Sequence, residues 1–232
     1  MTKDEAMGLL ESWSDSKMRD VNLRHGASEN NLGVNLSKIR GLAKEIKSDP
    51  DLGLELWKTG QDEARRLATL ILKPKQLSME QLDAMAQEIS YFKVADWLGA
   101  NILKNSPHRD ALPEPWMASD KECVGRIGWS LATDWVKSHP ADAERYLDTI
   151  EVEMKQAPFR KQETMNFCLI EIGVRYPELR DQAIDIGYRL EVLRYYPVPK
   201  GCVGPFAPMA IAYFLGDESV KGMQGSEFTR RP

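Results

Sequence analysis

A carboxylate and an aromatic ring are spaced to share one face of a helix in the segment Tyr91-Phe92-Lys93-Val94-Ala95-Asp96-Trp97. Phe92 and Asp96 are four residues apart, so on a helix their side chains lie about one turn from each other. On a concave surface such a carboxylate could stabilise a developing cation, because Coulomb attraction grows as water is excluded. The alternative is structural, with an acid near the positive end of the helix dipole and the rings in the core. Spacing leaves both interpretations open.

A second group of candidates is basic and lies earlier in the chain. Helical arrays often present basic side chains and helix N-termini on one inner surface, where they can bind phosphates. The alternative is a set of solvated helix faces. The candidate phosphate contacts are Lys38, Arg40, Lys44, Lys47, Arg65 and Arg66.

Other chemistry has little support in the sequence. The three histidines are isolated, and the three cysteines lie far apart without a CxxC pair. Neither a zinc site nor a disulfide framework is indicated. The chain lacks a Gly-rich phosphate loop, an HExxH motif and a GxSxG elbow. We therefore expect no metal and no cofactor.

The elements that position these residues are predicted to be helices. In residues 61–72, apolar Ala64, Leu67, Ala68 and Ile71 recur at helical spacing, and Pro74 ends the pattern. Similar stripes, caps and prolines mark further helices. They are predicted at 36–47, 50–58, 78–90, 91–104, from a Ser119-Asp120 cap to 138, and at 141–156, 159–175, 177–194 and 206–215.

Short connections make neighbouring helices antiparallel partners, and helix pairs recur at about 35 to 45 residues. Alternating runs and hairpin turns that would indicate a sheet are nearly absent. We predict an all-α fold, an α-solenoid of antiparallel helix pairs of the HEAT-like or armadillo type. Residues 1–216 are expected to form a single domain closed by the 206–215 helix, and residues 217–232 a frayed tail.

Composition is that of a globular protein, with 42% hydrophobic and 28% charged residues and a net charge of −4. No apolar run approaches the roughly 20 residues of a spanning helix, and the N-terminal segment is charged. We expect no membrane attachment, a cytoplasmic location and, because capped solenoids need no partner to close them, a monomer. A negative net charge does not exclude nucleic-acid binding, since one face of a protein can be basic while the opposite face is acidic.

Several segments, taken in order, resemble the HEAT-like DNA alkylation repair family of AlkD-type alkylpurine glycosylases. Residues 33–72, GVNLSKIRGLAKEIKSDPDLGLELWKTGQDEARRLATLIL, are similar to its N-terminal half. ISYFKVADWL (89–98) looks like the helix that carries its active-site acid, and GRIGWSL (125–131) looks like its Ile-Gly-Trp-Ala-Leu helix. VPKGCVGPFAPMAI (198–211) resembles a C-terminal signature of one branch. The resemblance spans about residues 20 to 214.

This resemblance implies a helical array that holds duplex DNA and excises N3- or N7-alkylated purines. Carried over by position, Asp96 would be the catalytic acid and Phe92 would contact the lesion sugar, with Tyr91 and Lys93 beside it. Arg126 and Lys200, which lie in the resembling segments, join Lys38, Arg40, Lys44, Arg65 and Arg66 as expected contacts to the DNA backbone.

A second hypothesis is a non-catalytic helical-repeat module that binds DNA structure or a protein partner. Two departures from the family pattern motivate it. Tyr91-Phe92-Lys93 stands where the family often has Trp-Trp-Asp, and Ala132 stands where an arginine is often found.

Overall fold

The computed structural model describes residues 1–229 and places helices, with no strand in that range. The all-helical prediction is confirmed. Within the described range the chain divides into two compact units, residues 1–112 and the residues from 113 onward. None of the helices among the described residues is both long enough and apolar enough to cross a membrane.

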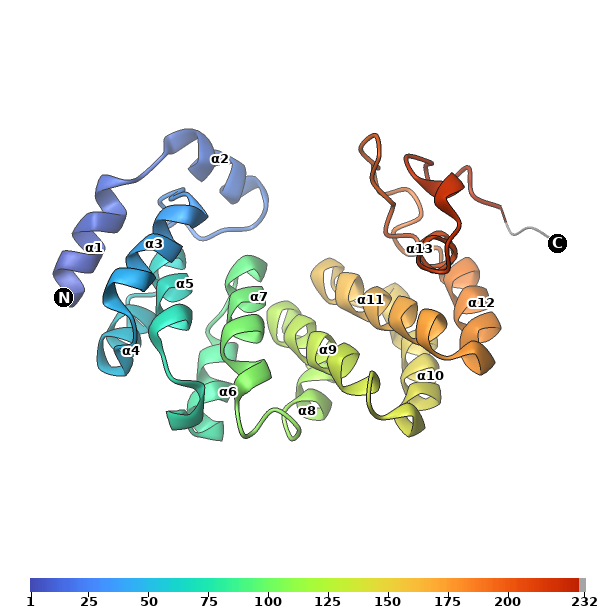
Figure 1. The fold of residues 1–232 in the computed structure, drawn as a ribbon, viewed down its shortest axis with the longest axis horizontal. Coiled ribbons are helices and arrows are strands. Elements are labelled where there is room, and N and C mark those ends of the chain that lie inside the picture. The colour runs from blue at the N-terminus through green and yellow to red at the C-terminus, as the bar shows by residue number, and fades with distance from the viewer. Residues whose placement is uncertain (230–232) are drawn as a thin grey trace. The chain divides into compact units, whose positions relative to one another are not determined.

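The first unit consists of seven α-helices (Figure 1). They are α1 (Lys3–Ser12), α2 (Ser16–Arg24), α3 (Leu36–Ile46), α4 (Pro50–Lys58), α5 (Asp62–Ile71), α6 (Met79–Gln87) and α7 (Phe92–Asn101). The last five lie within the predicted ranges. Helices α1 and α2 were not predicted, because neither sequence has a continuous apolar stripe.

Local capping explains where these helices begin. The Asp49 side chain accepts the N–H of Leu52 at 3.1 Å, and Pro50 occupies the first turn of α4. Ser78 forms a capping box with Gln81 at the start of α6. Helix α5 is central to the unit, since it packs against α3, α4 and α7. Its apolar stripe is fully buried there, as predicted.

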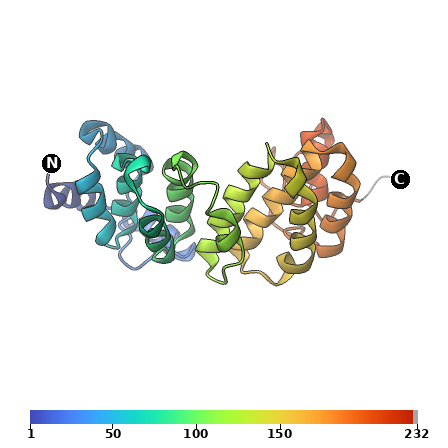
Figure 2. The same cartoon turned by 90° about the horizontal axis from the view of Figure 1, so that it is seen from below.

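Among the described residues the second unit has six α-helices, built around the longest of them, α11. They are α8 (Pro113–Met117), α9 (Glu122–Val136), α10 (Ala143–Glu153), α11 (Phe159–Arg175), α12 (Arg180–Leu190) and α13 (Ala207–Phe214). Helix α11 packs extensively against α9, which runs beside it (Figure 2), and also against α12 and α13. All but α8 were predicted; α8 has five residues, too few to show a period.

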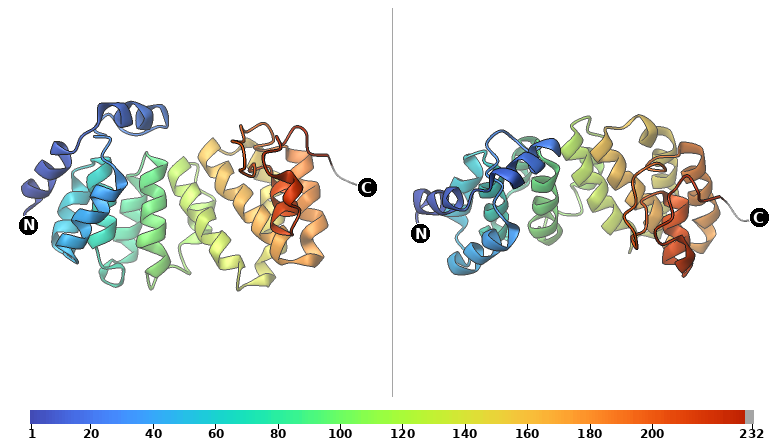
Figure 3. Two further views of the ribbon diagram at one scale, coloured as in Figure 1. Left: turned by 45° about the horizontal axis from the view of Figure 1, so that its top comes forward. Right: turned by 90° about the horizontal axis from the view of Figure 1, so that it is seen from above.

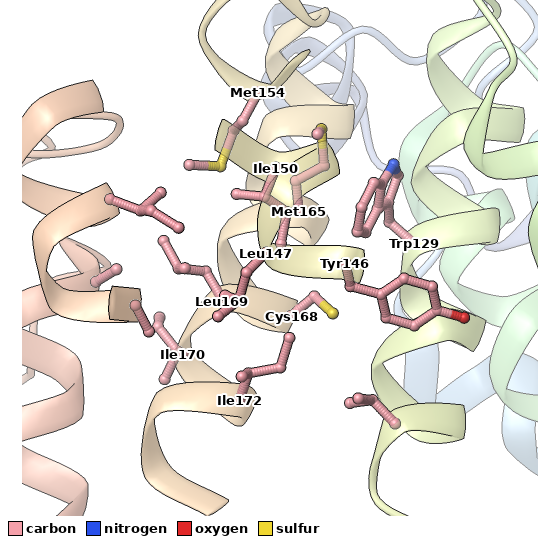
Figure 4. Close-up of a cluster of buried hydrophobic side chains, with 14 of the residues drawn as sticks. Trp129, Tyr146, Leu147, Ile150, Met154, Met165, Cys168, Leu169, Ile170 and Ile172 are labelled. Atoms are coloured by element: carbon pink, nitrogen blue, oxygen red, sulfur yellow. The ribbon is translucent and has the colours of Figure 1, made fainter. Parts of the chain in front are cut away.

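The core of this unit lies between α9, α10 and α11 (Figure 4). Trp129 and Tyr146 meet edge to face with ring centres 6.0 Å apart, and Leu147, Met165 and Cys168 fill the space beside them. Edge-to-face aromatic packing adds to the stabilisation from buried area. Burial also raises the pKa of the Cys168 thiol to about 12, which keeps it protonated and unreactive.

Helix α13 and the segment after it close the end of this unit (Figure 3). Phe206, Met209 and Val220 form a small buried cluster, and Phe228 packs against it. Residues 217–229 of the expected frayed tail thus contribute Val220, Met223 and Phe228 to this cluster, because apolar residues recur within this charged segment. Residues 230–232 lie outside the described part.

Candidate nucleic-acid interface

Helix α7 holds the predicted acid on its exposed side. Val94, Ala95 and Leu98 are buried and fix the orientation of the helix. The Asp96 side chain is exposed, and Phe92, one turn earlier, is half-buried. The carboxylate and the ring therefore share the accessible face of the helix, as their spacing predicted.

The residue before α7, Tyr91, is completely buried and organises the start of this helix. Its hydroxyl donates a hydrogen bond to Asn22 Oδ1 at 3.3 Å, and the Lys93 ammonium donates to the same oxygen at 3.2 Å. The Lys93 nitrogen also lies 5.8 Å from the centre of the Tyr91 ring. The structure thus brings Tyr91 and Lys93 together. Tyr91, which the resemblance placed beside the lesion contact, is buried beneath the surface.

Asn22 comes from α2, and hydrogen bonds connect it to the loop that follows. Its amide donates to Asn31 Oδ1 at 3.1 Å, and both asparagines are buried. Arg66 lies below the Tyr91 ring at 5.5 Å and is only 2% exposed. A buried cation over an aromatic face is stabilised by the ring quadrupole. Arg66 therefore supports α7 from inside rather than presenting its charge to solvent.

Two buried carboxylates at the first turn of α5 hold the loop between α2 and α3. Asp62 accepts hydrogen bonds from the backbone N–H and the hydroxyl of Ser28, at 3.0 and 3.1 Å. Glu63 accepts the N–H groups of Leu32 and Gly33, at 3.1 and 3.0 Å. The helix dipole favours both acids at this end of α5. Helix α2 and its loop are thus fixed across the N-terminal ends of α5 and α7.

Gly33 is required at this contact. Its φ of +75° favours glycine, and a Cβ would lie 2.3 Å from the carbonyl oxygen of Asp15. The loop therefore depends on a position that tolerates no side chain.

Two of the exposed cations of α3 lie over tryptophan rings. Lys38, Arg40 and Lys44 are all exposed. The Arg40 guanidinium lies over the ring of Trp97, 5.4 Å from its centre, and the Lys38 ammonium lies 5.6 Å from the centre of the Trp13 ring. Since Trp97 directly follows Asp96, Arg40 joins the charged face of α3 to the acid-bearing face of α7.

Arg65 has a different environment from the α3 cations. It forms an ion pair with Glu88 at 3.0 Å, and its guanidinium lies 5.2 Å from the centre of the Trp57 ring. Trp57 also donates its indole N–H to Glu88 at 3.1 Å. Arg65 therefore connects α4, α5 and the end of α6.

The remaining predicted DNA contacts, Arg126 and Lys200, belong to the second unit. Arg126 is 7% exposed and donates to Glu163 at 2.7 Å and to the carbonyl of Arg160 at 3.0 Å. Lys200 is exposed in the loop between α12 and α13. Ala132 is fully buried in the core, so its position offers no surface for a phosphate contact.

Sequence reasoning missed the buried part of this site. Asn22 and Asn31 lie in polar segments without an apolar stripe, so no local pattern marks them as buried. The sequence showed that Trp97 is next to Asp96, but it did not predict the contact between Trp97 and Arg40. Among residues 1–229, no group of three or more histidine, cysteine or acidic side chains is arranged to hold a metal ion.

One solved structure aligns over 97% of this chain and 97% of its own, with a TM-score of 0.75 and 21% sequence identity. It is described as representing a new family of proteins related to the HEAT-like repeat DNA glycosylases, with affinity for branched DNA structures. By fold, this chain is a HEAT-like helical-repeat protein, as predicted. No curated protein matches the sequence.

The family follows from the sequence itself. The model of the DNA alkylation repair enzyme family matches residues 6–194, which is most of the chain. The protein therefore belongs to the DNA alkylation repair family, and the resemblance that its motifs indicated is confirmed.

Proposed function

We propose that the protein binds DNA and hydrolyses the glycosidic bond of N3- or N7-alkylated purines, with Asp96 as the catalytic acid. Membership of the DNA alkylation repair family supports the substrate class. The observation that carries the proposal is the exposed Asp96 carboxylate, one turn from the accessible Phe92 ring and beside the Trp97–Arg40 pair.

The chemistry demands little beyond one carboxylate. An N3- or N7-alkylated purine is already cationic, so it leaves with the electron pair of the C1′–N bond without needing a proton. The sugar then becomes an oxocarbenium ion, which water attacks at C1′ with release of a proton. Asp96 would stabilise that cation and orient the water, while Phe92 packs against the sugar.

Bound DNA must cover Asp96 for this to be effective. Two unit charges of opposite sign 4 Å apart attract by about 1 kcal/mol in bulk water but by about 4 kcal/mol at the effective dielectric near a protein surface.

We propose that the exposed Lys38, Arg40, Lys44 and Lys200 contact DNA phosphates.

The less exposed cations have a different proposed role. Arg65, Arg66 and Arg126 are engaged with Glu88, Tyr91 and Glu163 respectively. We propose that Arg65 and Arg66 contribute by holding α5 and its neighbours, α7 among them, and that Arg126 contributes by holding α9 against α11.

The second candidate is non-catalytic binding of branched DNA. It is favoured by the described affinity of the structural neighbour for branched DNA, and by Lys93, whose positive charge lies one turn before Asp96 and would repel a cationic lesion. Alkylated duplex and branched DNA would then be bound through the same phosphate contacts, without bond cleavage. A protein partner is the further alternative.

The deciding experiment measures release of 7-methylguanine and 3-methyladenine from methylated duplex DNA. We compare the wild type with Asp96→Asn and, as a matched control, Asp51→Asn, which changes an exposed acid on α4. We expect Asp96→Asn to lower the rate by about 10²–10³-fold, the usual effect of removing one group that stabilises transition-state charge. Asp51→Asn should leave the rate unchanged.

If the wild type releases neither base, glycosidic hydrolysis is excluded. Titration with duplex DNA and with a four-way junction, at several salt concentrations, then tests the second candidate. Phosphate contacts make affinity fall with salt, with a slope of roughly −0.9 for each contact to duplex DNA. Absence of binding to either DNA at low salt would leave a protein partner.

A further inference from the structure

The second unit contains a cavity that glycosidic hydrolysis at Asp96 does not use. It has a volume of about 380 Å³ and lies between α11, the loop after α12, and α13. Ligand sites in proteins usually have volumes of about 300–1,000 Å³ and are mostly apolar. This cavity is large enough for one flat heterocycle, and its walls are mainly hydrocarbon and aromatic.

Three aromatic rings at this cavity are unusually accessible. Phe167 on α11 is 49% exposed, Phe214 at the end of α13 is 62% exposed, and Tyr196 is 43% exposed. Exposed apolar side chains that gather around one hollow, rather than lying scattered, mark a binding surface. Ile170 and Leu193, which also line the cavity, add an apolar wall behind the rings.

The one charged residue that lines the cavity among those described is Glu163, and two arginines hold its carboxylate. Arg126 donates to Oε2 at 2.7 Å and Arg160 donates to Oε1 at 2.8 Å. Each carboxylate oxygen can accept a second hydrogen bond. The group is therefore fixed in place and able to accept from an amino group in the cavity. The two arginines lie behind Glu163 and do not line the cavity themselves, so the carboxylate is the polar group that a ligand meets there.

We propose that this cavity binds an unpaired nucleobase of DNA, such as one displaced at a branch. This proposal rests on the proposed DNA binding and names the DNA feature that the second unit recognises. A base supplies flat faces for Phe167, Phe214 and Tyr196 and an exocyclic amino group for Glu163. A purely aliphatic ligand would leave the Glu163 cluster without a role. An apolar protein side chain would likewise offer Glu163 no hydrogen-bond donor.

Base stacking on aromatic rings tolerates different sequences, because every base has a π-face. The cavity is therefore expected to select unpaired bases over paired ones, with little preference among base types. Unpaired bases at branches and bulges also avoid the cost of extraction from a duplex.

The test uses the full chain and DNA containing 2-aminopurine, either unpaired in a flap or paired within a perfect duplex of equal length. Emission of 2-aminopurine reports stacking at that base, and anisotropy of a distant label reports affinity. The variants are Phe167→Ala and Phe214→Ala. Tyr195→Ala is the matched control, because Tyr195 is the most exposed aromatic in this loop and does not line the cavity. Circular dichroism checks that each variant is folded.

We expect the wild type to quench the flap 2-aminopurine and to prefer flap over duplex. Each of the two cavity variants should weaken flap binding about tenfold, equivalent to ~1.4 kcal/mol, and reduce the quenching. Their duplex affinity should not change, and Tyr195→Ala should behave as the wild type.

Two results would overturn the proposal, and they differ in what else they exclude. Equal binding of flap and duplex, unchanged in Phe167→Ala and Phe214→Ala, would exclude the nucleobase site while leaving DNA binding intact. Absence of binding to either DNA at low salt would exclude the proposed DNA binding together with this site.

Discussion

Replacement of Glu63 by glutamine should loosen the loop that covers the start of α7. Glu63 is completely buried, and its two carboxylate oxygens accept the separate N–H groups of Leu32 and Gly33. Glutamine keeps one acceptor oxygen and places an NH₂ group where the other stood. One of the two backbone N–H groups must then face a donor.

The cost follows from these contacts. A hydrogen bond to a charged group contributes about 1.5–3 kcal/mol, and loss of an acid at a helix N-terminus costs a further ~0.3–1 kcal/mol. We expect the first unit to lose about 2–4 kcal/mol of its free energy of unfolding in Glu63→Gln. At a urea slope of ~2 kcal/mol per molar, the unfolding midpoint should fall by about 1–2 M.

Amide hydrogen exchange at residues 32 and 33 provides the direct measurement. A loss of ~2 kcal/mol in local stability should accelerate exchange there by about 30-fold. Glu55→Gln, at an exposed position on α4, is the control and should stay within about 0.5 kcal/mol of the wild type. If Leu32 and Gly33 exchange in Glu63→Gln at the same rate as in the wild type, the conclusion that this carboxylate fixes the loop is refuted.

Two further predictions concern the second unit. Gly128→Ala should destabilise it by about 1–3 kcal/mol, because a Cβ would lie 2.4 Å from the backbone nitrogen of Met117; calorimetry should find no such loss in the first-unit control Gly99→Ala, where nothing lies within 4 Å. A hydrogen bond from Trp135, and then one from Arg145, lowers the pKa of Asp142 below its ordinary value. Its stabilisation is therefore complete above the unfolded pKa of about 3.9 and is lost as the pH falls through the lower folded value. Denaturation midpoints of the wild type and Asp142→Asn should accordingly converge below about pH 4, and a constant difference down to pH 2 would contradict this explanation.

The sequence by itself determined where most helices lie and to which family the chain belongs. Asp49-Pro50 starts α4, and the prolines that flank α11 fix its bounds at Phe159 and Arg175, as predicted. These signals are local, because caps and prolines act within one turn of the residues that carry them. Helical spacing also placed Asp96 and Phe92 on one face. That inference needed no knowledge of distant residues.

Tertiary structure decided which polar side chains are buried and what they contact. Asn22 bonds to Tyr91 and Lys93 across 69 and 71 residues of chain, and Arg126 bonds to Glu163 across 37. Periodicity indicates which face of a helix is apolar. It does not reveal whether another segment of the chain covers the polar face of that helix. Arg66 and Arg40 have the same residue type, yet one lies beneath Tyr91 and the other lies exposed beside Trp97. Only packing between helices, which no local pattern encodes, separates the arginine that is buried beneath Tyr91 from the arginine that is exposed to solvent.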